Sequence, residues 1–311
     1  IKILLLEGVH AVAVKKLQDA GYAVEADPSS LKEEALLDRI KDVHVLGIRS
    51  KTKVTAGHFE AAQRLLAVGC FGVGTNQVVL DAATSHGVPV FNAPYGNTRS
   101  VAELTIGHMI ALARKAGDGN RRMHEGRWKK SAKGCFEVRD KVLGIVGFGH
   151  IGQQVGIIAE ALGLRVIFFD LRPQLPLGNT RQVESLDKLF AEADFVSLHV
   201  PATPSGQPLV GRNELGKMKK GAYLINTSRG TLIDFSALRD SIESGHLGGA
   251  AIDVYPGEPK SNDEPFDCGL TGLANVILTP HLGGSTEEAQ YKIGEEVAAT
   301  FVRFIDEGAT V

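Results

Sequence analysis

Cysteine is scarce in this 311-residue chain: the three present, Cys70, Cys135 and Cys268, lie far apart and form no C-x-x-C pair. Their odd number and spacing argue against a disulfide framework and against a cysteine zinc site. No apolar run approaches the ~18 residues that cross a bilayer, and residues 1–6 read as a strand rather than as a cationic signal peptide. We therefore expect a soluble cytoplasmic protein with no metal and no membrane partner.

The chain also lacks an excess of charge of either sign. It has 34 Lys and Arg against 36 Asp and Glu, a formal net charge of −2. Without a strong positive field to hold a polyphosphate backbone, the chain is not expected to bind nucleic acid. At ~150 residues per domain, its length favours two domains.

Glycine is abundant, with 36 residues against a typical share of ~7%. From residue 141 onwards, β-branched apolar runs alternate with turns and helix-periodic segments, which is typical of a parallel sheet covered by helices on both faces. Six runs are predicted as strands that complete a doubly wound fold: 142–147, 165–170, 195–200, 222–226, 250–254 and 276–279. The first ~95 residues repeat the pattern on a smaller scale, with predicted strands at 1–6, 43–49, 65–69 and 88–92.

A G-x-G-x-x-G motif, Gly147, Gly149 and Gly152, follows the first of the six runs and opens a helical segment. Gly147 would make the tight turn, Gly149 would let a pyrophosphate approach the backbone, and Gly152 would let the helix sit close to the strand. Asp170 ends the next strand, 23 residues after Gly147. Its carboxylate would bind ribose hydroxyls and repel a 2′-phosphate, so we expect NAD rather than NADP as the cofactor.

Three polar residues follow three later strands. Arg229 comes after the run 222–226, Glu258 after 250–254, and His281 after 276–279. Ligands of open α/β sheets bind at the carboxyl ends of strands, so these groups are expected to converge on one substrate. Arginine can grip a carboxylate, histidine can exchange a proton with a carbonyl or hydroxyl oxygen, and a neighbouring glutamate would raise the pKa of that histidine.

The sequence resembles the D-isomer-specific 2-hydroxyacid dehydrogenases in four segments. They are residues 147–152, 226–230, 258–259 and 279–286. The resemblance runs over essentially the whole chain. It implies that Arg229 binds the substrate carboxylate, His281 is the acid/base and Glu258 supports it. It places a further set of residues along NAD: His150, Ile151, Thr227, Ser228, Asp253, Gly283 and Gly284. It also implies that Arg49, Ser50 and Asn97 contact the substrate.

More narrowly, the segments 7–10, 69–77 and 91–104 resemble the branch of the family that oxidises 3-phospho-D-glycerate to 3-phosphohydroxypyruvate in serine biosynthesis. That resemblance implies a small phosphorylated 2-hydroxy or 2-oxo acid as substrate and a homodimer or homotetramer. Arg49 and Lys51 are candidate phosphate ligands. The charged run 127–133 around Trp128 is a solvated face, a part of the substrate cleft or a subunit interface. Many members of this branch continue into a C-terminal regulatory domain that binds serine, and feedback regulation stays open for this protein.

The predicted fold is therefore two doubly wound parallel-sheet domains, a Rossmann domain inserted in a smaller flavodoxin-like domain. Residues 1–96 form the first part of the substrate-binding domain, 97–283 the NAD-binding domain, and 284–311 a helix that returns to the substrate-binding domain.

Three other activities would keep the same Arg229, Glu258 and His281: glyoxylate/hydroxypyruvate reductase, D-lactate dehydrogenase and 2-oxoglutarate reductase. Family members that oxidise formate usually carry Gln where Glu258 stands. An NAD-sensing, corepressor-like interaction protein is the alternative outside enzymes.

Overall fold

The computed structural model of the protein describes residues 1–259 and 264–310. The chain divides into two compact units. The first contains Ile1–Thr98 and Gly284–Val311, and the second contains Arg99–Gly283. The first boundary lies two residues beyond the one expected after residue 96.

The first unit is built on a five-stranded parallel sheet in the order β2-β1-β3-β4-β5. Its strands are β1 (Lys2–Leu5), β2 (Ala23–Ala26), β3 (Val45–Ile48), β4 (Ala67–Cys70) and β5 (Val90–Asn92). This is the flavodoxin-like order, in which the chain reverses its direction of travel across the sheet between β1 and β3. Ligands of such sheets bind beyond the carboxyl ends of the two strands at that reversal.

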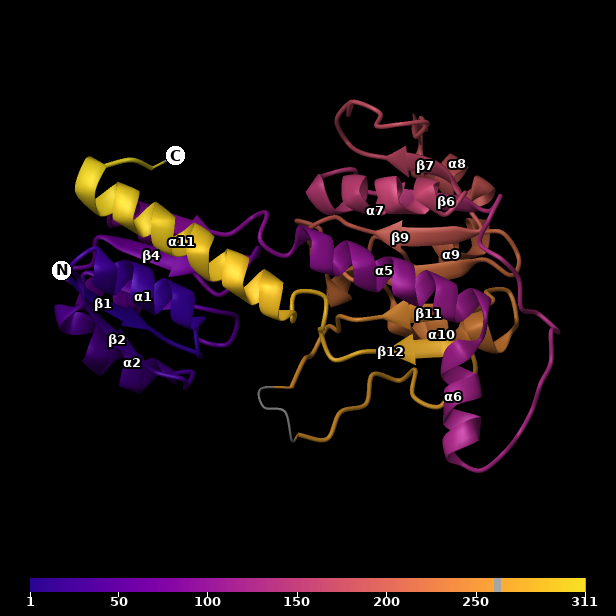
Figure 1. The fold of residues 1–311 in the computed structure, drawn as a ribbon, viewed down its shortest axis with the longest axis horizontal. Helices are drawn as coiled ribbons and strands as arrows, with labels where there is room; N and C mark the ends of the chain where they lie inside the picture. The colour runs from indigo at the N-terminus through magenta and orange to yellow at the C-terminus, as the bar shows by residue number, and fades with distance from the viewer. Residues whose placement is uncertain (260–263, 311) are drawn as a thin grey trace. The chain divides into compact units, whose positions relative to one another are not determined.

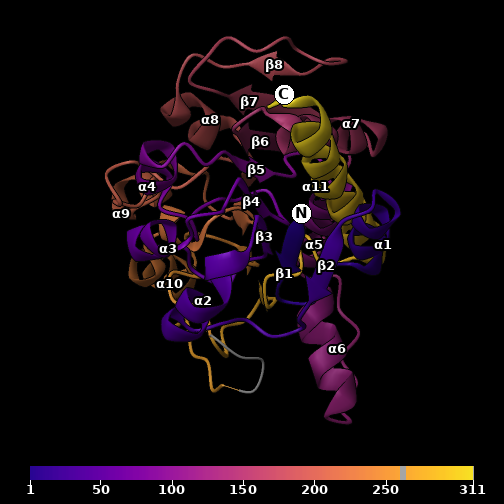
Figure 2. The ribbon, with the colours of Figure 1, turned by 90° about the vertical axis from the view of Figure 1, so that its left-hand side faces the viewer.

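Helices cover both faces of this sheet (Figure 2). One face carries α1 (Ala11–Asp19) and α11 (Glu287–Glu307), which pack against each other. The other carries α2 (Glu33–Arg39), η1 (Ile40–Asp42), α3 (Ala56–Ala61) and α4 (Leu80–Ser85).

Helix α11 belongs to the core of the first unit. The Thr286 side chain accepts a hydrogen bond from the Ala289 N–H (3.1 Å) and caps the start of the helix, and Gly308 ends it in the left-handed conformation. Val297 and Phe301 are fully buried on the β-sheet. The last segment of the chain therefore completes the apolar core that the first 98 residues begin.

The second unit is built on a seven-stranded parallel sheet in the order β12-β11-β10-β9-β6-β7-β8. Its strands are β6 (Val142–Val146), β7 (Arg165–Phe169), β8 (Arg181–Gln182), β9 (Phe195–Leu198), β10 (Tyr223–Asn226), β11 (Gly249–Ile252) and β12 (Val276–Leu278). Counted within the unit, the first six strands have the Rossmann order 3-2-1-4-5-6, and β12 extends it by one. The expectation of two parallel-sheet α/β units is confirmed.

Two helical layers sandwich the second sheet (Figure 1). One layer contains α5 (Thr98–Ala113) and α7 (His150–Ala161), whose apolar side chains share a core with β6, β7 and β9. The opposite layer contains α8 (Leu186–Glu192), α9 (Arg212–Lys217) and α10 (Phe235–Glu243). The remaining helices of the unit are α6 (Ala116–His124) and η2 (Gly230–Leu232).

The sequence interpretation was wrong about the number of strands in each sheet. It omitted β2 in the first unit and β8 in the second, and counted six strands where the described residues form seven. Both omitted strands lie at a sheet edge, and each carries exposed residues, such as Glu25 and Arg181. The continuous apolar run that marks a buried parallel strand is therefore missing from both.

Candidate active site

The glycine motif forms a tight turn between β6 and α7. Gly147 has φ +90°, and a Cβ there would lie 2.6 Å from the carbonyl oxygen of His199. A Cβ on Gly152 would lie 2.2 Å from the carbonyl oxygen of Gly147, so the helix can approach the turn only with glycine at this position. At Gly149, which caps α7, no atom lies within 4 Å of the Cβ position. The helix N-terminus is therefore open to a phosphate group, and the motif fits a dinucleotide.

Asp170 lies beside this turn, directly after β7. One of its carboxylate oxygens accepts a hydrogen bond from the Phe148 N–H (2.9 Å), and the other accepts one from the Arg172 N–H (3.2 Å). These bonds fix the carboxylate against the glycine-rich turn and leave lone pairs for the ribose hydroxyls of a bound dinucleotide.

The other predicted cofactor residues of this unit lie after strands of the same sheet or at the start of α7. His150 and Ile151 form the first turn of α7, and Thr227 and Ser228 follow β10. The Thr227 hydroxyl is buried, 3.0 Å from the hydroxyl of Thr105 on α5. Because all strands are parallel, these residues share the carboxyl edge of the sheet with Gly149.

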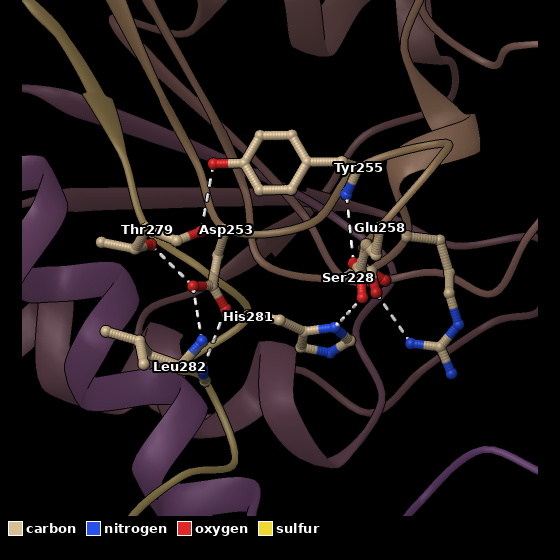
Figure 3. Close-up of polar contacts among 9 residues, drawn as sticks. Ser228, Asp253, Tyr255, Glu258, Thr279, His281 and Leu282 are labelled. Carbon is tan, nitrogen blue, oxygen red and sulfur yellow. Dashed lines mark hydrogen bonds and ion pairs between the residues drawn. The ribbon is translucent and has the colours of Figure 1, made fainter. Parts of the chain in front are cut away.

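At the same edge, the structure brings His281 and Glu258 into direct contact (Figure 3). His281 Nδ1 lies 2.8 Å from Glu258 Oε2. The second oxygen of Glu258 accepts a hydrogen bond from the Tyr255 N–H at 3.2 Å. Glu258 is therefore held by its own loop while it orients the imidazole, and Nε2 of His281 is the ring nitrogen that faces away from it.

The electrostatics of the pair favour its charged form. The hydrogen bond to Glu258 raises the pKa of His281 above its usual value, against the opposing effect of burial. Burial alone would raise the pKa of Glu258, but the hydrogen bond with His281 and the neighbouring cations outweigh it and lower that pKa. Imidazolium and carboxylate thus stabilise each other.

Arg229 follows β10 and lies close enough to Glu258 for their charges to interact. Its Nη1 donates a hydrogen bond to the Ser228 carbonyl (2.7 Å), and its own carbonyl accepts one from the Asn226 side chain (2.8 Å). Burial lowers its pKa and Glu258 opposes that shift, but a guanidinium stays protonated in proteins. Its remaining N–H groups form a fork that matches a carboxylate.

Gly230 explains how the Arg229 loop can approach the Glu258 loop. A Cβ at Gly230 would lie 2.0 Å from the carbonyl carbon and 2.4 Å from the Cα of Tyr255. The obstacle is backbone, which cannot move aside as a flexible side chain can. Glycine at this position therefore lets the loops after β10 and β11 touch.

Asp253 holds the loop that carries His281 (Figure 3). Its fully buried carboxylate accepts hydrogen bonds from the Thr279 hydroxyl (2.6 Å), the Leu282 N–H (2.8 Å) and the Gly283 N–H (2.9 Å). The backbone of His281 is left-handed, with φ +54°. Such a conformation persists in a non-glycine residue only where its surroundings hold it, and it is common at active sites.

Sequence reasoning did not identify three residues of this region. The Thr279 hydroxyl binds Asp253 and lies 3.4 Å from Nε2 of the buried His108 on α5. The Tyr255 hydroxyl lies 3.0 Å from the carbonyl oxygens of both Ile252 and Thr279, and so links the ends of β11 and β12. Thr279 could have been noticed from its place in Thr-Pro-His, but no sequence signal pointed to Tyr255 or His108.

The predicted substrate residues Arg49, Ser50 and Asn97 belong to the first unit, as does Gly284. Arg49 and Ser50 follow β3, and Asn97 precedes α5. A Cβ on Gly284 would lie 3.0 Å from Asn97 Nδ2, so the two segments that enter and leave the second unit run side by side here.

Within residues 1–259 and 264–310, no cluster of three or more His, Cys, Asp or Glu side chains is arranged to hold a metal ion. Among the same residues, none of the helices is both long enough and apolar enough to cross a membrane.

Comparisons with known proteins identify the family to which the chain belongs. Residues 106–283 match the family model of the D-isomer specific 2-hydroxyacid dehydrogenase NAD binding domain. The chain therefore belongs to the D-isomer specific 2-hydroxyacid dehydrogenases, and it is an NAD-dependent dehydrogenase.

Among individual relatives, the chain is 51% identical to D-3-phosphoglycerate dehydrogenase of Escherichia coli K12. The match covers all of this chain and 76% of the length of the relative. The chain is 50% identical to D-3-phosphoglycerate dehydrogenase of Dictyostelium discoideum, with the same coverage. Of solved structures, it resembles an NAD-dependent formate dehydrogenase from Staphylococcus aureus in complex with NAD, with a TM-score of 0.84 and 29% identity. That comparison covers 100% of this chain and 97% of the other.

Proposed function

We propose that this protein oxidises 3-phospho-D-glycerate to 3-phosphohydroxypyruvate with NAD, the first step of phosphorylated serine biosynthesis. The observation that carries the proposal is the His281–Glu258 contact at 2.8 Å, at the sheet edge that also presents Arg229 and the open glycine turn. The substrate is supported by the two relatives at about half identity, both of which bear the name D-3-phosphoglycerate dehydrogenase.

In this proposal each residue of the trio has one role. Arg229 binds the substrate carboxylate through the N–H groups that Ser228 does not use. His281 takes the proton of the 2-hydroxyl group on Nε2, while Glu258 holds Nδ1 and stabilises the imidazolium that forms. When bound, NAD supplies the acceptor for the hydride that leaves C2 of the substrate.

The other predicted site residues are proposed to bind the cofactor or the substrate. Gly147, Gly149, His150, Ile151 and Gly152 would hold the pyrophosphate, and Asp170 the adenosine ribose. Thr227, Ser228, Asp253, Gly283 and Gly284 are proposed to complete the NAD site. Arg49, Ser50 and Asn97 are proposed to bind substrate.

We also propose that the protein is a cytoplasmic homodimer or homotetramer. Trp128, a residue that is 79% exposed, supports a subunit interface, and three free cysteines support a reducing compartment. Light scattering of the purified protein measures its mass in solution directly. The mass of a monomer would contradict the proposed homodimer or homotetramer.

The substrate is tested by NADH oxidation with a panel of phosphohydroxypyruvate, hydroxypyruvate, glyoxylate, pyruvate and 2-oxoglutarate. We expect the highest kcat/KM with phosphohydroxypyruvate. A higher value with another acid would assign the protein to one of the other D-2-hydroxyacid reductases. NADH binding without turnover of any of the five acids would contradict the proposed enzymatic function and favour the NAD-sensing alternative.

A further inference from the structure

A carboxylate of the first unit is bound by three backbone N–H groups of one loop. Glu7 follows β1, and its side chain reaches the loop that follows β3. Its Oε1 accepts hydrogen bonds from the N–H groups of Thr52 (2.7 Å) and Arg49 (3.3 Å), and its Oε2 accepts one from Lys51 (2.9 Å). The loop 49–52 is thus wrapped around a single anionic group.

Arg49 is held at two further points. Its carbonyl accepts a hydrogen bond from Gln77 Nε2 at 2.5 Å, and its guanidinium Nη1 donates one to the Glu7 carbonyl at 3.3 Å. Glu7 therefore fixes both the backbone and the side chain of Arg49. Arginine carries five N–H donors, so most of them stay available for another anion.

The backbone of Glu7 adopts a costly conformation to make these contacts. Its φ is +64°, in the left-handed region that residues with a long side chain rarely occupy. Such conformations persist where surrounding structure holds them and cluster at functional sites.

The contacts lie where a doubly wound sheet binds ligands. Strands β1 and β3 are adjacent, and the chain order reverses between them, so Glu7 and Arg49 flank the reversal at the carboxyl ends. A free carboxylate at this place would repel an anionic substrate. The three N–H donors spread and offset the charge of Glu7. The guanidinium of Arg49 meets the carbonyl of Glu7 rather than its carboxylate, so its positive charge can still serve an anionic ligand.

We propose that Glu7 is a positioning residue, which holds Arg49 in the conformation that binds the anionic substrate. The inference rests on the proposed function, because it takes Arg49 as a substrate ligand. Glu7 itself does not touch the substrate; it acts through the loop 49–52.

A double-mutant cycle tests this coupling. Glu7→Gln keeps the size of the side chain but turns an NH2 group towards backbone donors, so the loop loses at least one hydrogen bond. We expect KM for the 2-oxo acid to rise about tenfold with kcat and NADH affinity unchanged, as for loss of a binding interaction. In an Arg49→Ala background the same change should raise KM by less than about twofold, because its target is gone.

The matched control is Glu60→Gln on α3, an exposed position of the same unit, which should leave KM unchanged. An unchanged KM in Glu7→Gln, or an equal rise with and without Arg49, would overturn the inference. So would a fall in kcat or NADH affinity of the same size as the rise in KM, since that indicates general structural damage.

The measurement uses the acid in the panel that the wild-type protein reduces fastest. If that acid is not phosphohydroxypyruvate, the proposed substrate fails while the coupling between Glu7 and Arg49 is still measured. Hydrogen exchange provides a readout without turnover: the amides of Arg49, Lys51 and Thr52 should exchange at least about tenfold faster in Glu7→Gln. Unchanged exchange would overturn the inference on its own.

Discussion

At the scale of single residues, the contact between Glu258 and His281 governs the charge of the imidazole. The hydrogen bond raises the pKa of His281, so the imidazolium persists to higher pH than in a free histidine. If His281 is the acid/base, as proposed, reduction of a 2-oxo acid needs the protonated ring and is lost as pH rises through this pKa. Oxidation of the hydroxy acid then needs the neutral ring and is lost as pH falls through the same pKa.

The variant Glu258→Gln should therefore move the pH dependence in a defined direction. It keeps a hydrogen-bond acceptor but removes the negative charge, so the pKa of His281 should fall. The pH at which reduction is half-maximal should drop by about one unit, and the acidic limb of oxidation should drop with it.

The pH profiles of kcat/KM for both directions measure this shift. Glu137→Gln, an exposed position of the same unit, is the control and should leave both profiles in place. Profiles of Glu258→Gln that coincide with the wild type would show that this pair does not set the titration.

The position of Arg229, Glu258 and His281 at one edge of the sheet could be predicted from the sequence, because each follows an apolar strand and parallel strands end at the same edge. The contacts that hold these three residues in place could not be predicted from the sequence. Asp253 ends a strand in the same way, but its three hydrogen bonds to the His281 loop depend on backbone directions that residue spacing does not specify. The left-handed backbone of His281 is likewise set by tertiary contacts.

At the scale of elements, the strands with apolar sequences could be predicted, and the two polar edge strands, β2 and β8, could not. The apolar runs of β6 and β9 are buried from both faces, which forces continuous hydrophobic sequence. The edge strands β2 and β8 pair on one side only and tolerate polar residues, so their sequences resemble loops.

The close approach of two loops at Gly230 gives a prediction at this scale. Gly230→Ala places a methyl group against the backbone of Tyr255, so the loops after β10 and β11 must separate. We expect a loss of about 1–3 kcal/mol of unfolding free energy. The kcat/KM should fall as well, because Arg229 is displaced relative to Glu258.

Thermal unfolding and steady-state kinetics measure the two effects. Gly216→Ala on α9 is the matched control, since no atom lies within 4 Å of its Cβ position and alanine favours helix. It should leave activity unchanged and not lower the melting temperature. A Gly230→Ala protein as stable and active as this control would show that the close approach is not required.

At the scale of the whole molecule, the chain contains two parallel sheets, each with its own reversal of strand order. In the second unit the reversal lies between β6 and β9, where the glycine turn opens, and in the first between β1 and β3, beside Arg49. The sequence predicts both sheets because alternating strands and helices leave a strong pattern. It does not predict Glu7 as a partner of the Arg49 loop, since that contact joins residues more than forty positions apart.

The proposed role of His281 is to exchange the proton in a dehydrogenase that acts on a phosphorylated 2-hydroxy acid. Its most direct test compares phosphohydroxypyruvate reduction by the wild type and by His281→Asn, together with the NADH dissociation constant of each. We expect kcat to fall by about 10²- to 10⁴-fold in the variant while NADH affinity stays nearly the same. An unchanged kcat in His281→Asn would contradict this role.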